Sequence, residues 1–282
     1  GENGSRGETE PRGPREIGEA FADLGASPGV DTQQEGARIG LTVMADRTEQ
    51  AVALLADVFQ RPALDAAAFL RLRERRLHAM AAFGNNPQAL GVRALQAAVF
   101  GREHPYGRPK GGTPQTVAAL GPEAPRRFYE SHIGPATCAL VFAGRISLRD
   151  AVQLTMRHFG AWDHAATVPE VPVQPPARQR EQILFVSSPG LSQTVILAGR
   201  TAVPDGHADE AALRIASAAV EGTLWGRLRR EQGRTYSVDV SFDAGPRASL
   251  MVISAAVQAD ATAEAIREFE EAMPRVRNSF DD

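Results

Sequence analysis

The stretch from Leu224 to Val240 most constrains the fold, because its pattern changes from helical to extended within a few residues. Leu224 and Leu228 are four residues apart, as on one face of a helix, and Gly233 offers the left-handed stop that commonly ends a helix. From Tyr236 to Val240 polar and apolar residues alternate, which is typical of a strand. The stretch therefore predicts a helix, a turn and a strand that meet at a corner.

Two side chains of this corner have a chemistry that suits ligand binding. Arg229 lies in the last turn of the predicted helix, and Tyr236 lies at the start of the predicted strand. A guanidinium beside a phenol suits a carboxylate or a polarised peptide carbonyl, because the first donates two hydrogen bonds and the second adds a neutral donor. Spacing alone favours a plainer interpretation, in which Arg229 is a solvated helix arginine and Tyr236 is an ordinary half-buried strand aromatic.

The motif Leu228-Arg-Arg-Glu-Gln-Gly-Arg-Thr-Tyr-Ser-Val238 resembles the second-domain signature of the pitrilysin/insulinase family of zinc peptidases. This resemblance implies that Arg229 and Tyr236 bind the substrate backbone and the oxyanion across a cleft from the zinc ion. Further pieces of the chain follow in the family's order, and together they cover nearly all of it: Arg61-Pro-Ala-Leu64, His104-Pro-Tyr-Gly-Arg-Pro109, Val141-Phe-Ala-Gly144 and Phe159-Gly-Ala-Trp162.

The resemblance implies an α+β fold with two similar domains, each an antiparallel sheet packed with helices, that face each other across a cleft. The length also suits two domains. A Pro-rich run divides them, so we expect a first domain at 1–167, a linker at 168–180 and a second domain at 181–282. Relative to the family, the chain is expected to be truncated at both ends, with the second domain incomplete.

Apolar periodicity predicts the elements of these domains. Residues 27–45 are expected to be irregular and extended. Cys138, the sole cysteine, lies in an apolar run and is predicted to be a small buried hydrophobe. Helices are predicted at 14–24, 48–59, 66–83, 87–100, 122–132, 147–159, 208–220 and 261–273, and strands at 136–143, 182–186, 193–199, 236–240 and 248–257.

Family members that cleave peptides carry the zinc motif His-x-x-Glu-His and a third ligand, Glu, on a later helix, which leaves one position on the metal open for water. The sequence contains no such motif, and the resemblance places it upstream of Pro14. The third ligand falls at Ala79, or at Ala81 if the register slips, and no acid occurs between Glu74 and Glu103. Alanine cannot bind zinc, so we expect neither a metal site nor a cofactor in this chain.

Composition excludes other classes of function. The formal net charge is −3 and the arginines are scattered among acids, with Lys110 the only lysine, so nothing indicates nucleic-acid binding. No window is apolar for long enough to span a membrane. We expect a soluble protein of the bacterial cytoplasm or periplasm.

Three functions stay open. Some bacterial members of the family are two-chain enzymes, and this chain is similar to their metal-free subunit: a non-catalytic partner that supplies Arg229 and Tyr236 in trans to a zinc-bearing homologous subunit and a peptide substrate. It would be inactive alone. The alternatives are a structural subunit, like the core subunits of the respiratory cytochrome complex, and a single-chain zinc endopeptidase whose zinc helix lies upstream of residue 1. The corner supports the last alternative, and Ala79 argues against it.

Overall fold

The chain forms two compact units, which we describe from a computed structural model that covers residues 13–83, 86–167, 182–187, 191–227 and 235–278. The first unit contains Gly1–Thr32, Ala37–Arg76 and Gln115–Glu170, and the second contains Gln33–Gly36, Leu77–Pro114 and Val171–Asp282. The predicted linker at 168–180 lies outside the described residues, so the domain division at that linker stays a prediction.

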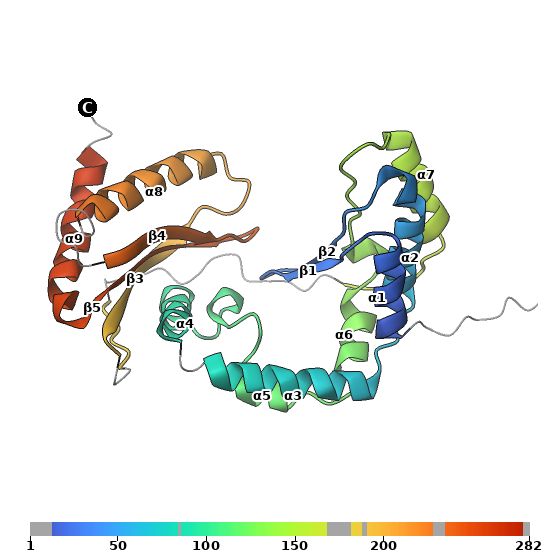
Figure 1. Ribbon diagram of the computed structural model, residues 1–282, viewed down its shortest axis with the longest axis horizontal. Coiled ribbons are helices and arrows are strands. Elements are labelled where there is room, and N and C mark those ends of the chain that lie inside the picture. Colours follow the sequence, from blue (N-terminus) through green and yellow to red (C-terminus); the bar gives the residue numbers. More distant parts are fainter. Residues whose placement is uncertain (1–12, 84–85, 168–181, 188–190, 228–234, 279–282) are drawn as a thin grey trace, which may run out of the picture. The chain divides into compact units, whose positions relative to one another are not determined.

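The second unit is built on an antiparallel sheet of strands β3 (Gln193–Ala202), β4 (Thr235–Asp243) and β5 (Ser249–Gln258). The strand order is β3-β5-β4, so β5 is central and pairs with both neighbours (Figure 1). Helices and an antiparallel sheet in one unit confirm the predicted α+β class. They also confirm the predicted strands at 193–199, 236–240 and 248–257.

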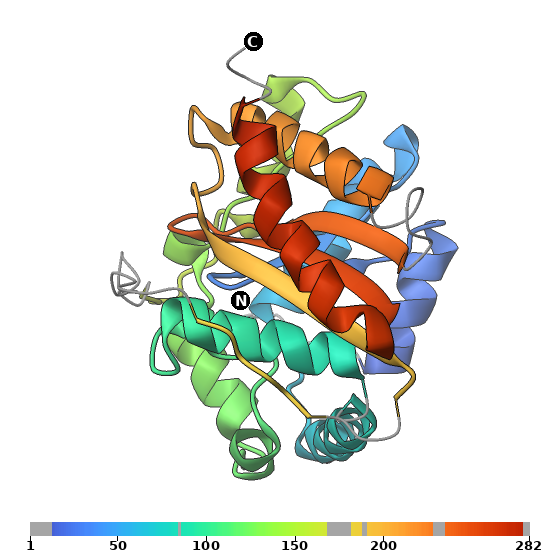
Figure 2. The same ribbon diagram turned by 90° about the vertical axis from the view of Figure 1, so that its left-hand side faces the viewer.

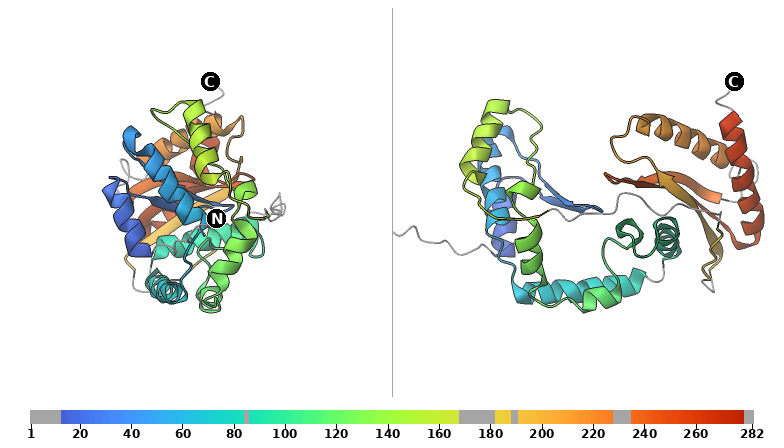
Figure 3. Two further views of the ribbon diagram at one scale, coloured as in Figure 1. Left: turned by 90° about the vertical axis from the view of Figure 1, so that its right-hand side faces the viewer. Right: turned by 180° about the vertical axis from the view of Figure 1, so that it is seen from behind.

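Helices cover both faces of this sheet, because β5 is apolar on both sides. Ile253, Ala255 and Val257 face a core shared with α8 (Glu210–Trp225) and α9 (Thr262–Asn278). The alternate residues, Leu250 and Val252, face a core shared with α4 (Pro87–Phe100). Figure 2 shows α9 crossing the strands, and Figures 1 and 3 show α8 and α4 on opposite faces.

Helix α4 belongs to the second unit by its contacts, whereas the sequence division placed it in the first domain. The reason is its close packing on β3. A Cβ atom added at Gly199 would lie 2.7 Å from Leu95 Cδ2 and 2.8 Å from the Met251 carbonyl oxygen. Only a glycine permits the helix to lie this near to the strand.

The first unit is mostly helical. Helices α1 (Pro14–Asp23) and α2 (Thr48–Gln60) share a core with Phe21 and Leu54 buried at its centre, and Figure 3 shows the two helices side by side. Helix α7 (Leu148–Phe159) packs on α2 and begins at Ser147, whose hydroxyl accepts a hydrogen bond from the Asp150 amide at 3.1 Å. The remaining elements are α3 (Ala66–Phe83), which ends in the second unit, α5 (Pro114–Ala118), α6 (Ala124–His132), β1 (Gly29–Thr32) and β2 (Ala37–Gly40).

These bounds confirm the predicted helices to within a few residues, apart from α8, α9 and α6. Helix α8 runs five residues beyond its predicted end at residue 220, and α9 also runs five beyond 273. Helix α6 begins two residues later than predicted, at Ala124. No helix in the described ranges is long and apolar enough to cross a bilayer.

Three predictions about extended segments are wrong. Residues 27–45 contain the paired strands β1 and β2 rather than an irregular stretch. Residues 138–143 and 182–187 form no strand, because no described segment pairs with them and a strand requires a hydrogen-bonded neighbour. Their apolar side chains are exposed, with Val141 at 85% and Phe185 at 88%. Cys138 is likewise exposed rather than buried.

Candidate functional site

Helix α8 carries the first part of the predicted corner and is anchored by Leu224. The Leu224 side chain is fully buried, and it shares a core with Val238 of β4 and Phe269 of α9. The same leucine thus ties the end of α8 to strand β4.

Arg227 makes a buried ion pair next to this anchor. It lies three residues beyond Leu224, so the continuing helical turn places it on the same face. Its Nε pairs with the Glu268 carboxylate of α9, and its Nη2 lies 3.4 Å from Glu271 Oε2. The Arg227 and Glu268 side chains are only 17% and 11% exposed. This pair fixes the chain at the residue before the segment 228–234.

Strand β4 begins with a β-bulge on the other side of that segment. Thr235 pairs with Val257 and Ser237 pairs with Ala256, so two steps along β4 correspond to one step along β5. The extra residue is Tyr236. The Thr235 hydroxyl, which is buried, lies 2.7 Å from the Ala256 carbonyl oxygen and 2.9 Å from the Ser237 carbonyl oxygen. Its single proton is therefore shared between carbonyl oxygens of the two strands across the bulge.

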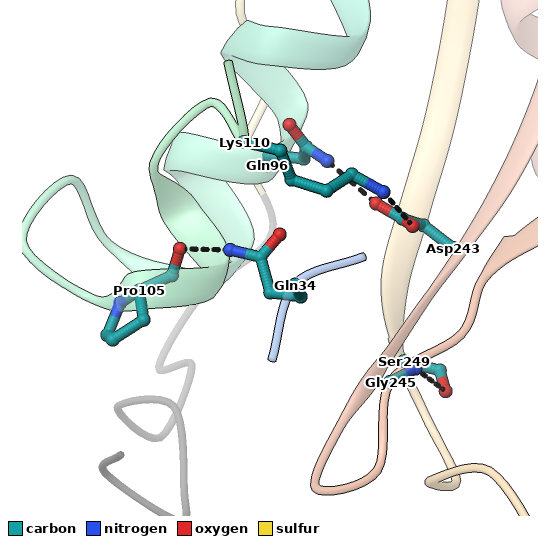
Figure 4. A network of polar contacts seen from close by, with 7 residues as sticks. All are labelled: Gln34, Gln96, Pro105, Lys110, Asp243, Gly245 and Ser249. Atoms are coloured by element: carbon teal, nitrogen blue, oxygen red, sulfur yellow. Dashed lines mark hydrogen bonds and ion pairs between the residues drawn. The ribbon is translucent and has the colours of Figure 1, made fainter. Parts of the chain in front are cut away.

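The opposite end of β4 is held by polar contacts. Asp243 accepts hydrogen bonds from Gln96 Nε2 of α4 and from Lys110 Nζ, each at 3.0 Å (Figure 4). In the turn that leads to β5, the Gly245 amide donates to Ser249 Oγ at 3.4 Å. These contacts fix the turn between β4 and β5.

Tyr106 completes the support at this end. Its hydroxyl donates to the Glu35 carboxylate and accepts a hydrogen bond from the Arg247 amide at 3.4 Å. Burial, followed by the hydrogen bond to Glu35, raises the pKa of Tyr106 to about 12. A Cβ atom at Gly245 would lie 2.6 Å from the phenol oxygen, so glycine permits this close approach. The phenol is a structural group rather than an acid that titrates near neutral pH.

Among the predicted site residues, Arg229 lies outside the described residues. Tyr236 is described only in its backbone, as the extra residue of the bulge. The structure thus describes the frame on each side of the pair and does not test the expected approach of the two side chains.

A zinc ion does not fit the described residues. Ala79 is exposed on α3, next to the exposed His78, and offers no ligand atom. Within the described ranges, no group of three or more His, Cys, Asp or Glu residues is placed to hold a metal ion. The prediction that position 79 corresponds to the family's third ligand is not tested by the structure, but a methyl group at any such position cannot bind zinc.

Three supporting residues were not predicted from the sequence. Arg227 carries a signal, because its spacing from Leu224 puts a charge on the apolar face of a helix, and Glu268 has the same spacing from Ala265 of the core. Thr235 gives no such signal in the sequence. Threonine is common in strands, and a bulge does not change the pattern of polar and apolar residues in a recognisable way.

A family model described as the peptidase M16 inactive domain matches residues 120–282, more than half of the chain. No curated protein sequence matches the chain. Among solved structures, a peptidase M16 inactive domain from Pseudomonas fluorescens is 20% identical with a TM-score of 0.84, and the alignment covers 94% of this chain and 65% of that one. This chain thus spans less than two thirds of that relative.

Two further structures share the fold. The periplasmic protease PqqL from Escherichia coli is 12% identical with a TM-score of 0.75, over 93% of this chain and 29% of PqqL. Pitrilysin is 18% identical with a TM-score of 0.59, over 93% of this chain and 30% of pitrilysin. Together with the family match, they confirm the resemblance to the pitrilysin/insulinase family. The chain belongs to the peptidase M16 family, in which its matched region is described as an inactive domain.

Proposed function

We propose that this chain is the non-catalytic subunit of a heteromeric zinc peptidase and supplies Arg229 and Tyr236 to a zinc-bearing homologue. Zinc held by the partner would act as the Lewis acid and activate the attacking water. Arg229 of this chain holds the backbone of the peptide substrate. Tyr236 donates a hydrogen bond to the carbonyl oxygen on which negative charge develops.

The observation that carries this proposal is a contrast between two positions of the chain. The position at which the resemblance places the third ligand holds the exposed Ala79, whereas the segment with Arg229 is flanked by the buried Arg227 pair and the bulge at Tyr236. Bulges occur preferentially next to active sites, where they redirect a side chain.

The experiment is reconstitution with a zinc-bearing M16 homologue encoded in the same genome, followed by peptide turnover. Tyr236→Phe removes one hydroxyl, so assembly persists on size exclusion while turnover falls by a factor of ~10² to 10³, the usual cost of one oxyanion donor. Arg229→Ala weakens substrate binding as well and raises KM. Arg267→Ala, an exposed arginine of α9, is the matched control and leaves both unchanged.

Two outcomes separate this proposal from its alternatives. Wild-type turnover in complexes of both variants would identify a structural subunit. Metal analysis of the chain alone, after dialysis against zinc, is expected to give no stoichiometric zinc. One tightly held zinc ion per chain, together with peptidase activity without a partner, would instead identify a single-chain enzyme.

A further inference from the structure

The start of β4 contains a buried hydroxyl whose position is unusual for a strand residue. Thr235 is 1% exposed, and its Oγ1 lies within hydrogen-bond distance of two carbonyl oxygens. One belongs to Ser237, two residues along the same strand, and the other belongs to Ala256 of β5. Both bonds end on residues that border the bulge.

A bulge interrupts the regular ladder, because the extra residue has no partner opposite to it. The carbonyl groups at its edges therefore need another donor. Here two such carbonyl oxygens share the single proton of one hydroxyl, whose Oγ1 lies 2.7 Å from the carbonyl oxygen of β5 and 2.9 Å from that of β4. It thereby ties together the three backbone positions that determine how the chain passes through residue 236.

We propose that Thr235 is a positioning residue, whose hydroxyl fixes the geometry of the bulge and so the direction in which Tyr236 leaves the strand. This proposal rests on the proposed function, in which Tyr236 is the oxyanion donor. Thr235 itself touches neither the substrate nor the reacting atoms. Its role predicts an effect on turnover that passes entirely through Tyr236.

Two variants of similar shape isolate the hydroxyl. Thr235→Val replaces Oγ1 with a methyl group and keeps the volume of the buried side chain, whereas Thr235→Ser keeps the hydroxyl. In the reconstituted complex, we expect Thr235→Val to lower kcat roughly tenfold with little change in KM, because a small misplacement of a reacting group weakens only the transition state. Thr235→Ser is expected to retain at least half of the wild-type kcat.

A double-mutant cycle tests whether the effect passes through Tyr236. In the Tyr236→Phe background, Thr235→Val should change kcat no further, because the donor that it positions is already absent. Thr262→Val is the matched control: its hydroxyl makes two contacts of 2.8 Å, to Ala259 and Thr194, neither of which is a residue of the bulge. This control should leave kcat unchanged in both backgrounds.

A spectroscopic measurement makes the positioning role testable without turnover. The chain has three tyrosines, so ring-labelled tyrosine gives three NMR signals, and Tyr236→Phe identifies the one from residue 236. Thr235→Val should move that signal, whereas Thr235→Ser and Thr262→Val should not. The signals of Tyr106 and Tyr129 serve as internal controls for an intact fold.

The outcomes separate the two proposals. An unmoved Tyr236 signal in Thr235→Val, or an equal loss of kcat in the Tyr236→Phe background, would overturn the role of Thr235. A moved signal with turnover unaffected in both Thr235→Val and Tyr236→Phe would support the positioning role and overturn the function proposed for Tyr236. A moved signal with a tenfold lower kcat that Thr235→Ser restores would support both.

Discussion

The two ends of strand β4 are held by different kinds of interaction. The start is held by the apolar anchor Leu224, the buried Arg227–Glu268 pair and the hydroxyl of Thr235. The end is held by polar contacts of Asp243 with Gln96 and Lys110, and by Tyr106 in the neighbouring turn. The ladder is interrupted at the start, and it is regular from Ser237 to the end.

Under the proposed function, this difference lets one strand serve both as scaffold and as site. The regular end ties β4 to α4 and to the chain around Tyr106, so it contributes stability. The irregular start places an extra residue in the strand next to the segment that contains Arg229, and the described contacts of Leu224, of Thr235 and of Arg227 with Glu268 lie buried beside it. The variants below measure how far the two ends differ.

The largest effect is expected for Leu224→Ala at the start. Removal of a fully buried leucine typically costs about 3 kcal/mol, because the cavity collapses only partly. Leu250→Ala, in the core on the other face of the sheet, should cost a similar amount. Urea unfolding monitored by circular dichroism measures both. Leu72 on α3 is half-exposed, so Leu72→Ala is the control. If Leu224→Ala lowered the free energy of unfolding no more than Leu72→Ala does, Leu224 would not anchor the start of β4.

The next effect is expected for the ion pair. Glu268→Gln removes the carboxylate that pairs with Arg227 Nε, and we expect a loss of about 2 kcal/mol in the free energy of unfolding. The matched variant Glu271→Gln removes a carboxylate that is 55% exposed, and its cost should stay below about 0.5 kcal/mol. The double variant Arg227→Met with Glu268→Met should recover most of the stability. If Glu268→Gln and Glu271→Gln lowered the free energy of unfolding equally, burial would not make the Glu268 carboxylate the stronger partner of Arg227.

The sequence predicted the described helices of both units except the short α5, and it predicted three strands of the second unit. Their apolar residues repeat with the period of the element, and each such element has a partner to pack on. It failed at 138–143 and 182–187, where the same apolar pattern has no strand beside it. An apolar run indicates that its residues tend to be buried. A strand also needs a hydrogen-bonded neighbour, and the run itself does not specify one.

At the site, the sequence located the corner between α8 and β4 but not its supports. The resemblance to the family predicted the roles of Arg229 and Tyr236. The same resemblance placed the expected third zinc ligand at Ala79. The pairing of Arg227 with Glu268 joins residues 41 positions apart, and the Thr235 contact joins residues 21 apart. Only the tertiary structure brings such residues together.

The pH dependence of stability should reveal the Tyr106 contact at the end of β4. Because the folded-state pKa is raised from 10.0 to about 12, the folded chain holds this proton more tightly than the unfolded chain. The stability that the phenol contributes is complete below pH 10 and is lost as the pH rises toward 12.

The comparison with Tyr106→Phe isolates this contribution. At neutral pH the variant should be less stable by about 1 kcal/mol, since it loses the hydrogen bond to Glu35. The difference between wild type and variant should shrink above pH 10. Burial also raises the pKa of Tyr129, but that group is present in both proteins and cancels. A difference that stays constant up to pH 12 would contradict the assignment.

The smallest effect is expected for Lys110→Ala, which breaks the exposed pair at the end of β4. Lys110 and Asp243 are each 37% exposed, so solvent screens their attraction and the loss should be about 0.5 kcal/mol. Asp243 keeps its hydrogen bond from Gln96, which does not depend on the lysine. The loss should therefore vanish in high salt, whereas the loss from Glu268→Gln at the buried start should persist. Lys110 is the only lysine, so acetylation of the wild type gives a chemical counterpart of the variant that should show the same salt dependence. If the Lys110 effect persisted in high salt as fully as the Glu268 effect, the two ends of β4 would not differ in the way that their burial implies.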